Sequence, residues 1–307
     1  MKVLIIGGCG YTGSAIGKYL EDKHQITNVD LEWFGNYSKA TNINIDFNNL
    51  TIKFLNKFDV VILTAGHSSV KMCDNDLQSS FNNNVRNFVN LTEKLNEQKF
   101  IYASSASVYG NTSATEIAED NVNFSPINYY DMTKLHIDHI MKLSTIDYYG
   151  LRFGTVNGPA PNIRTDVMIN AMVNTAMQKG EIHVFNKDTR RSILGINDLC
   201  RAIDTIIDNE KTNRGVYNTA SFTNTAGEIA ESVGRIAGVP VIDKDPPSVI
   251  FNEKLQNKTY DFGISTAKFE NTFNFKFTDT LDSITQEIVE QYAKCNKGHR
   301  AEVIHYT

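Results

Sequence analysis

The sequence begins with a glycine-rich turn directly after a short apolar run, and this pairing restricts the possible fold more than any other feature. Residues 2–6 read KVLII and residues 7–13 read GGCGYTG, with Gly7, Gly10 and Gly13 at intervals of three. A β-branched run that stops at glycines is typical of a buried parallel strand. The glycines permit a tight turn into a helix and a close backbone approach to a pyrophosphate. The pattern predicts a dinucleotide-binding strand–turn–helix unit, although a tight turn without a ligand would need the same glycines.

An acidic residue stands where the ribose of such a dinucleotide would lie. Asp30 ends a second predicted strand, 25–30, at roughly the twenty-residue spacing that this type of unit shows. A carboxylate there accepts hydrogen bonds from the 2′-hydroxyl of NAD and repels the 2′-phosphate of NADP. Asp30 therefore favours NAD, with a plain turn residue as the alternative.

Strands alternate with helical segments over the first half of the chain. Further strands are predicted at 43–46, 59–66, 100–106 and 147–153. The clearest helical segment is 77–98, whose inward residues are predicted to be Phe81, Val85, Phe88, Val89, Leu91 and Leu95. This alternation predicts an α/β fold, a Rossmann-type doubly wound parallel sheet. We expect residues 1–155 to form an NAD-binding domain that also receives part of 190–220. Residues 156–307 should form mainly a smaller, discontinuous substrate-binding lobe.

Composition argues against several other classes of protein. The 30 basic and 35 acidic residues give a net charge of -5 without a block of like charges, which is unlike a nucleic-acid-binding surface. The apolar run at the N-terminus is too short for a signal peptide or a membrane span. The cysteines, at positions 9, 73, 200 and 295, do not have the spacing of metal ligands. We therefore expect a cytoplasmic protein with free thiols, without a nucleic acid, membrane or metal partner.

A tyrosine and a lysine share one helical face in the stretch NYYDMTKLH, residues 128–136. Tyr130 and Lys134 would lie about 40° apart around a helix, whereas Tyr129 and Lys134 would lie about 140° apart. A phenol has a pKa of about 10, which a neighbouring ammonium lowers toward the range of a general base. Upstream, YASSASVYG supplies Ser105, whose hydroxyl can hold a reacting substrate oxygen. The trio predicts hydride transfer to a nicotinamide with Tyr130 as the base, and leaves Tyr129 a packing or positioning residue.

Together these motifs resemble the extended short-chain dehydrogenases/reductases of the NAD-dependent epimerase/dehydratase family. The resemblance spans at least residues 1–200 and also draws on TAG at 64–66, Asn84 in FNNNV, LRFGTVNGP at 151–159 and RRSILGINDL at 190–199. It implies NAD as the cofactor and a nucleotide sugar as the substrate. It also implies a homodimer that pairs through the helices carrying Asn84 and Tyr130.

The resemblance assigns roles by position. It implies that Ser105, Tyr130 and Lys134 are catalytic, with Ser104 and Ser107 as weaker candidates for the serine. The implied cofactor-binding residues are Gly7, Gly10, Tyr11, Thr12, Gly13, Asp30, Asp46, Phe47, Thr64, Ala65, Gly66, Asn84, Ser104, Tyr130 and Lys134. The substrate-binding candidates are Ser105, Tyr130, Asn157, Arg191 and, from its place after TAG, His67. Arg191 would bind a diphosphate, a group that suits a guanidinium, with a surface arginine as the alternative.

Departures from the family pattern narrow the chemistry. Members that dehydrate a sugar have an Asp-Glu pair after the catalytic Ser or Thr, and decarboxylating members keep a Glu there. This chain has Ala106 and Ser107, neither of which can act as a carboxylate acid or base. Many members also carry a second diphosphate-binding arginine near residues 255–270, where this chain offers only Lys258 or Lys268.

The leading hypothesis is an NAD-dependent nucleotide-sugar epimerase, acting at sugar C4 by transient hydride transfer. A nucleotide-sugar reductase or dehydrogenase would use the same residues, and Asp30 counts mildly against an NADPH-dependent reductase. A non-catalytic dinucleotide sensor is the remote alternative, because such proteins typically lose the Tyr–Lys pair that this chain retains. His136 and His139 are three apart on the helix of Tyr130, but they lack a further ligand at matching spacing and are expected to be packing or solvated side chains.

Overall fold

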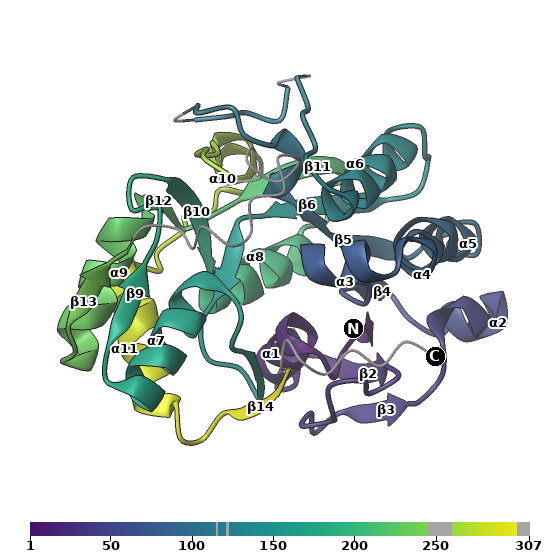
Figure 1. Cartoon of the computed structure of the whole chain (residues 1–307). Helices are drawn as coiled ribbons and strands as arrows, with labels where there is room; N and C mark the ends of the chain where they lie inside the picture. The colour runs from purple at the N-terminus through teal and green to yellow at the C-terminus, as the bar shows by residue number, and fades with distance from the viewer. Residues whose placement is uncertain (115, 121–122, 245–259, 300–307) are drawn as a thin grey trace.

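The computed structural model of the chain describes residues 1–114, 116–120, 123–244 and 260–299. Its centre is a seven-stranded parallel sheet in the order β11-β6-β5-β4-β1-β2-β3 (Figure 1). The strands are β1 (Lys2–Ile6), β2 (Gln25–Val29), β3 (Thr41–Ile43), β4 (Val60–Leu63), β5 (Lys99–Ser105), β6 (Tyr148–Phe153) and β11 (Gly215–Thr219). Because β1 pairs with both β2 and β4, the strand order reverses at β1. This is the doubly wound Rossmann arrangement, and it confirms the predicted fold class.

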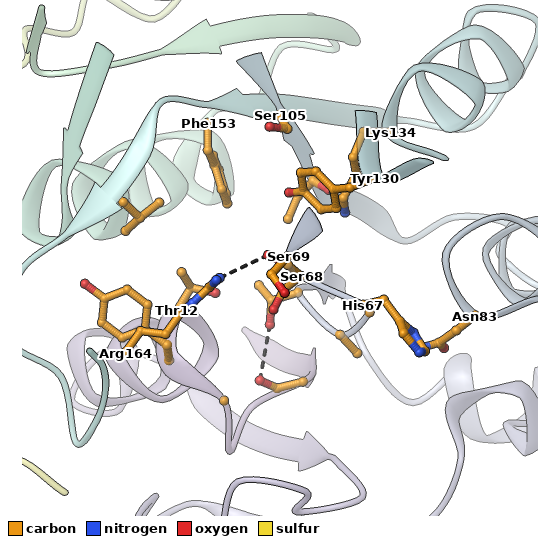
Figure 2. A pocket seen from close by; sticks show the side chains of 18 of the residues that line it. Thr12, His67, Ser68, Ser69, Asn83, Ser105, Tyr130, Lys134, Phe153 and Arg164 are labelled. Carbon is orange, nitrogen blue, oxygen red and sulfur yellow. Dashed lines mark hydrogen bonds between the residues drawn. The ribbon is translucent and has the colours of Figure 1, made fainter. Parts of the chain in front are cut away.

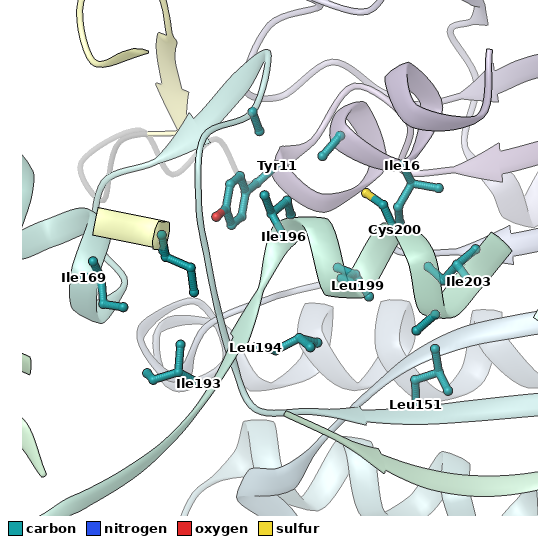
Figure 3. Close-up of a cluster of buried hydrophobic side chains, with 14 of the residues drawn as sticks. Tyr11, Ile16, Leu151, Ile169, Ile193, Leu194, Ile196, Leu199, Cys200 and Ile203 are labelled. Carbon is teal, nitrogen blue, oxygen red and sulfur yellow. The ribbon is translucent and has the colours of Figure 1, made fainter. Parts of the chain in front are cut away.

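Both faces of the sheet are buried at its centre, which explains why β1 and β4 read as nearly continuous apolar runs. Val3 and Ile5 of β1 belong to the core under α1 (Tyr11–Leu20) and α8 (Ile196–Asp208). Leu4 and Ile6 point to the opposite face and pack with Phe88 and other residues of the helices there. Figure 3 shows the first of these cores, where side chains of α8 meet α1 and the sheet.

Short helices and turns join the strands on the second face. They are η1 (Phe47–Asn49), α2 (Ile52–Leu55), α3 (Val70–Asn75), α4 (Leu77–Phe81), the π-helical turn η2 (Asn82–Arg86), α5 (Asn87–Thr92), η3 (Ala106–Tyr109) and α6 (Tyr129–Lys142). Across the parts of the chain that the structure describes, no helix is both long enough and apolar enough to cross a membrane.

The prediction that Phe81 faces inward on the helix 77–98 is wrong. Val85, Phe88, Leu91 and Leu95 are buried, but the side chain of Phe81 is 47% exposed. The segment is not one regular helix, because the π-helical turn η2 separates α4 from α5. A π turn inserts an extra residue per turn and shifts the helical phase, so Phe81 does not share a face with the residues after it.

A smaller lobe lies beside the carboxyl edge of the sheet, on the left in Figure 1. Its strands form a three-stranded sheet, β12-β10-β7, and two pairs, β13-β9 and β14-β8. They span β7 (Thr155–Asn157), β8 (Asn162–Arg164), β9 (Ile182–Val184), β10 (Arg190–Gly195), β12 (Phe222–Thr225), β13 (Val241–Asp243) and β14 (Asn296–His299). The helices α7 (Met168–Lys179), α9 (Ala226–Ala237) and α11 (Leu281–Gln291) pack together in this lobe, while α10 (Ala267–Phe273) contacts β11. The chain thus leaves the main sheet after β6 and returns to it for α8 and β11.

Candidate active site

A cavity of about 1050 Å³ lies between the sheet and the smaller lobe. Its walls come from the glycine-rich turn, the ends of β2 and β5, the loop after β4, the start of α6 and strands of the smaller lobe. Doubly wound folds bind ligands in this crevice, because the loops that follow β1 and β4 diverge where the strand order reverses. The volume exceeds the roughly 300–1,000 Å³ that one drug-sized ligand occupies, so it can hold a dinucleotide together with a second molecule.

The glycine-rich turn leaves no room for side chains on the cavity floor. Gly7 has a φ of +92°, and a Cβ added there would come within 2.4 Å of the backbone nitrogen of Ala65. A Cβ on Gly13 would lie 2.0 Å from the carbonyl oxygen of Gly7, so Gly13 permits packing of the turn and does not itself line the cavity. No side chain caps the N-terminus of α1 at Gly10. Its free N–H groups and positive dipole end therefore suit a diphosphate.

Asp30 faces the cavity at the end of β2. Its carboxylate accepts hydrogen bonds from the backbone nitrogens of Cys9, at 3.0 Å, and Glu32, at 2.7 Å. Burial raises the pKa of Asp30, although these backbone donors oppose the shift. Asp46 and Phe47 line the same cavity, and Asp46 caps η1 through the backbone nitrogen of Asn48. This end of the cavity offers Asp30 as a hydrogen-bond acceptor for a ribose and Phe47 as an apolar surface for an adenine.

Hydrogen bonds on the side away from the cavity hold the loop after β4 in place. The hydroxyl of Thr64 donates to the carbonyls of Ile6 and Gly7, at 3.2 Å each, and Thr64, Ala65 and Gly66 line the cavity. Asn84 accepts from the backbone nitrogen of His67 at 2.8 Å and donates to its carbonyl at 3.1 Å. Asn84 is therefore buried behind the cavity wall and holds the backbone of the loop.

The imidazole of His67 is turned away from the end of the cavity where Tyr130 lies. Its Nδ1 is 3.2 Å from the amide nitrogen of Asn83 and its Nε2 is 3.4 Å from the hydroxyl of Ser79. The ring of Trp33 packs edge-on at 5.8 Å. Figure 2 shows His67 directed toward Asn83, and burial lowers the pKa of the imidazole. The structure thus places His67 in the wall and not beside Tyr130.

Ser105, Tyr130 and Lys134 come together at the opposite end of the cavity (Figure 2). Ser105 ends β5, and Tyr130 lies in the first turn of α6. One turn later, Lys134 donates to the carbonyl oxygen of Ala103 at 2.8 Å, and its Nζ lies 5.8 Å from the centre of the Tyr130 ring. By contrast, Tyr129 is 48% exposed, so it neither reaches the cavity nor packs in the core.

Burial controls the protonation of this trio. It raises the pKa of Tyr130 to about 12, although the polar side chain of Ser105 and the charge of Arg164 act to lower it. Burial also lowers the pKa of Lys134 to about 8. Both shifts disfavour a phenolate beside an ammonium in the protein without its cofactor. A positive charge added near Tyr130, such as an oxidised nicotinamide ring, would lower the pKa of the phenol.

Two further observations fit a bound dinucleotide. The hydroxyl of Ser104 lines the cavity but is buried without a hydrogen-bond partner among the described residues. A buried hydroxyl without a partner is costly, and a ligand in the cavity can supply one. The close packing of Gly7 against Ala65 likewise brings the backbone of the turn to the cavity without an intervening side chain.

Two arginines reach the cavity from the smaller lobe. Arg191, on β10, donates to the carbonyl of Arg190 at 3.1 Å, and burial lowers the pKa of its guanidinium. Arg164, on β8, pairs with Asp166 at 2.8 Å and donates to the carbonyl of Ser68 at 3.0 Å. Sequence reasoning missed Arg164 because it lies in the lobe whose periodicity is weak, where no motif marks it.

Of the other candidates, Asn157 and Lys268 do not line the cavity, whereas Tyr11 lines it. Asn157 is buried and accepts from the backbone nitrogen of Ile169 at 2.9 Å, so it holds the start of α7 and its predicted substrate contact is not seen. The phenol of Tyr11 points into the smaller lobe and donates to the carbonyl of Gly158 at 2.8 Å. Lys268 donates to the carbonyl of Val216 at 2.6 Å, at the edge of the main sheet. Lys258 lies outside the described residues.

The two histidines of α6 do not form a metal site. The exposed His136 lies 2.6 Å from the carbonyl of Met132, and His139 packs edge-on against Phe124 at 5.5 Å. Within the described ranges, one grouping has ligand atoms close enough for a metal, namely His24, Asp204 and Asp208. None of the three lines the cavity.

Known proteins resemble this chain in both sequence and structure. A model of the NAD dependent epimerase/dehydratase family matches residues 3–220. The UDP-glucose 4-epimerase of Lactobacillus helveticus is 27% identical over 276 residues, which cover 78% of this chain and 83% of that protein. The solved ADP-L-glycero-D-manno-heptose-6-epimerase of Helicobacter pylori superposes with a TM-score of 0.81 at 25% identity, covering 95% of this chain and 96% of that one. The UDP-glucuronic acid 4-epimerase of Bacillus cereus, solved with UDP-glucuronic acid and NAD, gives a TM-score of 0.82 at 21% identity, with 96% and 99% covered. That last likeness shows the fold.

Proposed function

Because the chain belongs to the NAD-dependent epimerase/dehydratase family, as its motifs predicted, we propose that it is a nucleotide-sugar epimerase that uses NAD and acts at sugar C4. The observation that carries this proposal is the placement of Ser105, Tyr130 and Lys134 in one cavity with the glycine-rich turn and Asp30. A cavity of this kind can hold a nicotinamide and a sugar hydroxyl against the same phenol. The similar proteins with 4-epimerase activity support the choice of carbon.

The proposed chemistry is reversible oxidation of a carbinol. Bound NAD supplies the acceptor, and later the donor, of the hydride. Tyr130 takes the proton of the sugar hydroxyl at its phenolic oxygen and returns it when the keto group is reduced on the other face. Ser105 positions the reacting oxygen through its hydroxyl. Lys134 stabilises the phenolate, and Arg191 and Arg164 are placed to bind anionic groups of the substrate.

The residues after Ser105 favour epimerisation over dehydration. Ala106 is buried, and Ser107 follows with a hydroxyl at the cavity wall. Loss of water from a sugar needs an acid–base group, which neither Ala106 nor Ser107 provides. A reductase or dehydrogenase would use the same trio and differs only in releasing the product after one hydride transfer.

Product analysis with a panel of nucleotide sugars tests the proposal. The protein is incubated with each sugar and a catalytic amount of NAD, and NMR follows the appearance of the epimer. Epimer formation without net use of cofactor is expected. Consumption of one equivalent of reduced cofactor per turnover would instead identify a reductase.

Substitution of the two adjacent tyrosines separates an enzyme from a dinucleotide sensor. Tyr130→Phe should abolish turnover, because it removes the base. Tyr129→Phe is the matched control, since its side chain is exposed one position earlier, and it should leave turnover unchanged. Full turnover by the Tyr130→Phe variant would refute the catalytic assignment.

We also propose a homodimer that pairs through α4 and α6. These two helices contact each other, and each exposes large apolar side chains, Leu77 and Phe81 on α4 and Tyr129 and Met132 on α6. Exposed apolar surface of this kind marks interfaces. Light scattering of Phe81→Glu should report a monomer. Leu143→Glu, at an 89% exposed site beyond the other end of α6, should remain a dimer.

The expected location is part of the same proposal. The four cysteines are free thiols in the structure. Free thiols fit a reducing compartment such as the cytoplasm, and fractionation of cells that produce the protein would test this.

A further inference from the structure

Three side chains away from the cavity bring nitrogen and oxygen atoms close together near the contact of α1 with α8 (Figure 3). His24 lies in the turn between α1 and β2, and Asp204 and Asp208 lie in the last two turns of α8. One nitrogen or oxygen atom of each residue lies within 4.8 Å of those of the other two. The two carboxylates are four residues apart on α8, so they project from the same face of the helix. Two segments that are distant in the sequence thus offer one imidazole and two carboxylates to the same point.

The buried imidazole of His24 points into this cluster. Its side chain is only 8% exposed, and its Nε2 has no hydrogen-bond partner among the described residues. Nε2 lies 3.7 Å from Oδ1 of Asp204, an atom that is also buried and also lacks a hydrogen-bond partner within the described ranges. This separation is too long for a hydrogen bond. Two buried polar atoms that face each other without bonding are costly, and a ligand bound to both would remove that cost.

The separation between these two atoms fits a pair that shares one metal ion. Imidazole nitrogens and carboxylate oxygens bind Zn²⁺ at about 2.0–2.2 Å, so two ligands of one ion lie at most about 4.3 Å apart. The 3.7 Å between His24 and Asp204 is within this limit. Asp208 is exposed, so its carboxylate can move onto the ion without any repacking of the core.

Two neighbouring groups leave these ligand atoms available. Nδ1 of His24 is 3.4 Å from the backbone nitrogen of Met1, which is longer than a usual hydrogen bond. The ring can therefore carry its proton on Nδ1 and present the lone pair of Nε2. The ammonium of Lys23 pairs with Oδ2 of Asp204 and leaves Oδ1 to another ligand. The side chain of Lys23 is 52% exposed, so it can also turn away into solvent.

We propose that His24, Asp204 and Asp208 bind a divalent transition-metal ion, with Zn²⁺ as the best match. An imidazole with carboxylates is a ligand set that Zn²⁺ accepts, and three protein ligands leave its fourth tetrahedral position to water. Mg²⁺ is a poorer match, because it prefers oxygen ligands. The ion ties the turn before β2 to the end of α8 and so stabilises their packing. None of its ligands lines the cavity, and the inference is independent of the proposed function.

Titration calorimetry of the full chain with ZnCl₂, after dialysis against a chelator, tests the site. The natural protein should bind one Zn²⁺ per chain, and its Tm should rise when Zn²⁺ is added. His24→Gln and Asp208→Asn should each weaken binding by more than the roughly 10–100-fold that loss of an outer-shell partner costs, and both should lose the rise in Tm. Asp208→Asn replaces an exposed side chain by one of the same shape, so this variant should fold. Absence of Zn²⁺ binding in the natural protein, or unchanged binding in either variant, would overturn the proposal.

Two further variants separate a metal site from ordinary pairing of histidine with a carboxylate. His183 pairs with Glu181 at 2.8 Å and belongs to no three-ligand grouping among the described residues. His183→Gln is therefore the matched control and should leave Zn²⁺ binding unchanged, whereas a loss of binding there would refute the assignment. Lys23→Met removes the ammonium that competes for Asp204 and should tighten Zn²⁺ binding severalfold. A simple ion pair between His24 and Asp204 predicts no such gain, so unchanged or weaker binding in Lys23→Met would contradict the metal site.

Discussion

Removal of the charge on Lys134 gives the sharpest test of the proposed site. Lys134→Met keeps a side chain of similar length and removes the ammonium, whose Nζ lies 5.8 Å from the centre of the Tyr130 ring. At an effective dielectric constant of about 20, a cation and a phenolate at that separation attract by about 3 kcal/mol. Since one pKa unit corresponds to about 1.4 kcal/mol, the ammonium lowers the pKa of the phenol by about 2 units.

The variant should therefore lose about 100-fold of kcat at pH values below the pKa of the phenol, with tenfold recovery for each unit of rising pH. The natural protein should behave differently on the alkaline side. Burial lowers the pKa of Lys134 to about 8 in the free protein, so its charge is present below pH 8 and is lost above it. The kcat of the natural protein should therefore decline as Lys134 loses its charge, and this decline should be absent from Lys134→Met.

The assay is the pH profile of kcat, accompanied by tyrosinate absorption of the NAD-bound protein with Tyr130→Phe as the blank. Lys142→Met is the matched control, because Lys142 lies on the same helix at the same 5.8 Å from an aromatic ring, that of Phe124. It should leave the profile unchanged. A loss below about threefold in Lys134→Met, or a loss independent of pH, would refute the electrostatic argument.

Three further predictions concern stability and cofactor binding. Asp138→Ala should destabilise the fold by about 3–5 kcal/mol in urea titrations. The carboxylate of Asp138 lies 2.7 Å from Nε of the fully buried Arg152, and its removal leaves that guanidinium without its ion-pair partner. Gly7→Ala should abolish NAD binding measured by calorimetry, since its φ of +92° and the 2.4 Å approach to Ala65 exclude a Cβ. For Asp30, burial raises the carboxyl pKa, so NAD affinity measured by fluorescence should fall as pH drops through that raised pKa, whereas an ordinary carboxylate would stay ionised over the same range.

Local patterns explain why the sheet half of the fold was predictable. The strands β1 and β4 are buried on both faces, and residues 3–6 and 60–63 therefore read as uninterrupted apolar runs. The glycine spacing depends on a close approach within one short turn. The error at Phe81 arose where a π-helical turn changed the periodicity without a signal in the sequence.

Long-range contacts explain what sequence reasoning missed. Asn157 and Tyr11 carry polar groups that any reader would assign to a ligand, yet both are satisfied by partners far along the chain. Arg164 reaches the cavity from β8, which pairs with β14, a strand far along the chain. No spacing in the sequence encodes these encounters.

The sequence by itself predicted the doubly wound fold from local periodicity, and helical spacing predicted that Tyr130, not Tyr129, shares a face with Lys134. The order of its motifs along the chain gave the resemblance to the family. Only the tertiary structure decided which side chains face the cavity and which are used in packing. It also decided that Lys134 meets the carbonyl of Ala103, since these residues come from different elements and their contact depends on how α6 docks against β5. Burial then sets the protonation of Tyr130 and Lys134, and burial is a property of the packed molecule that no local stretch of sequence contains.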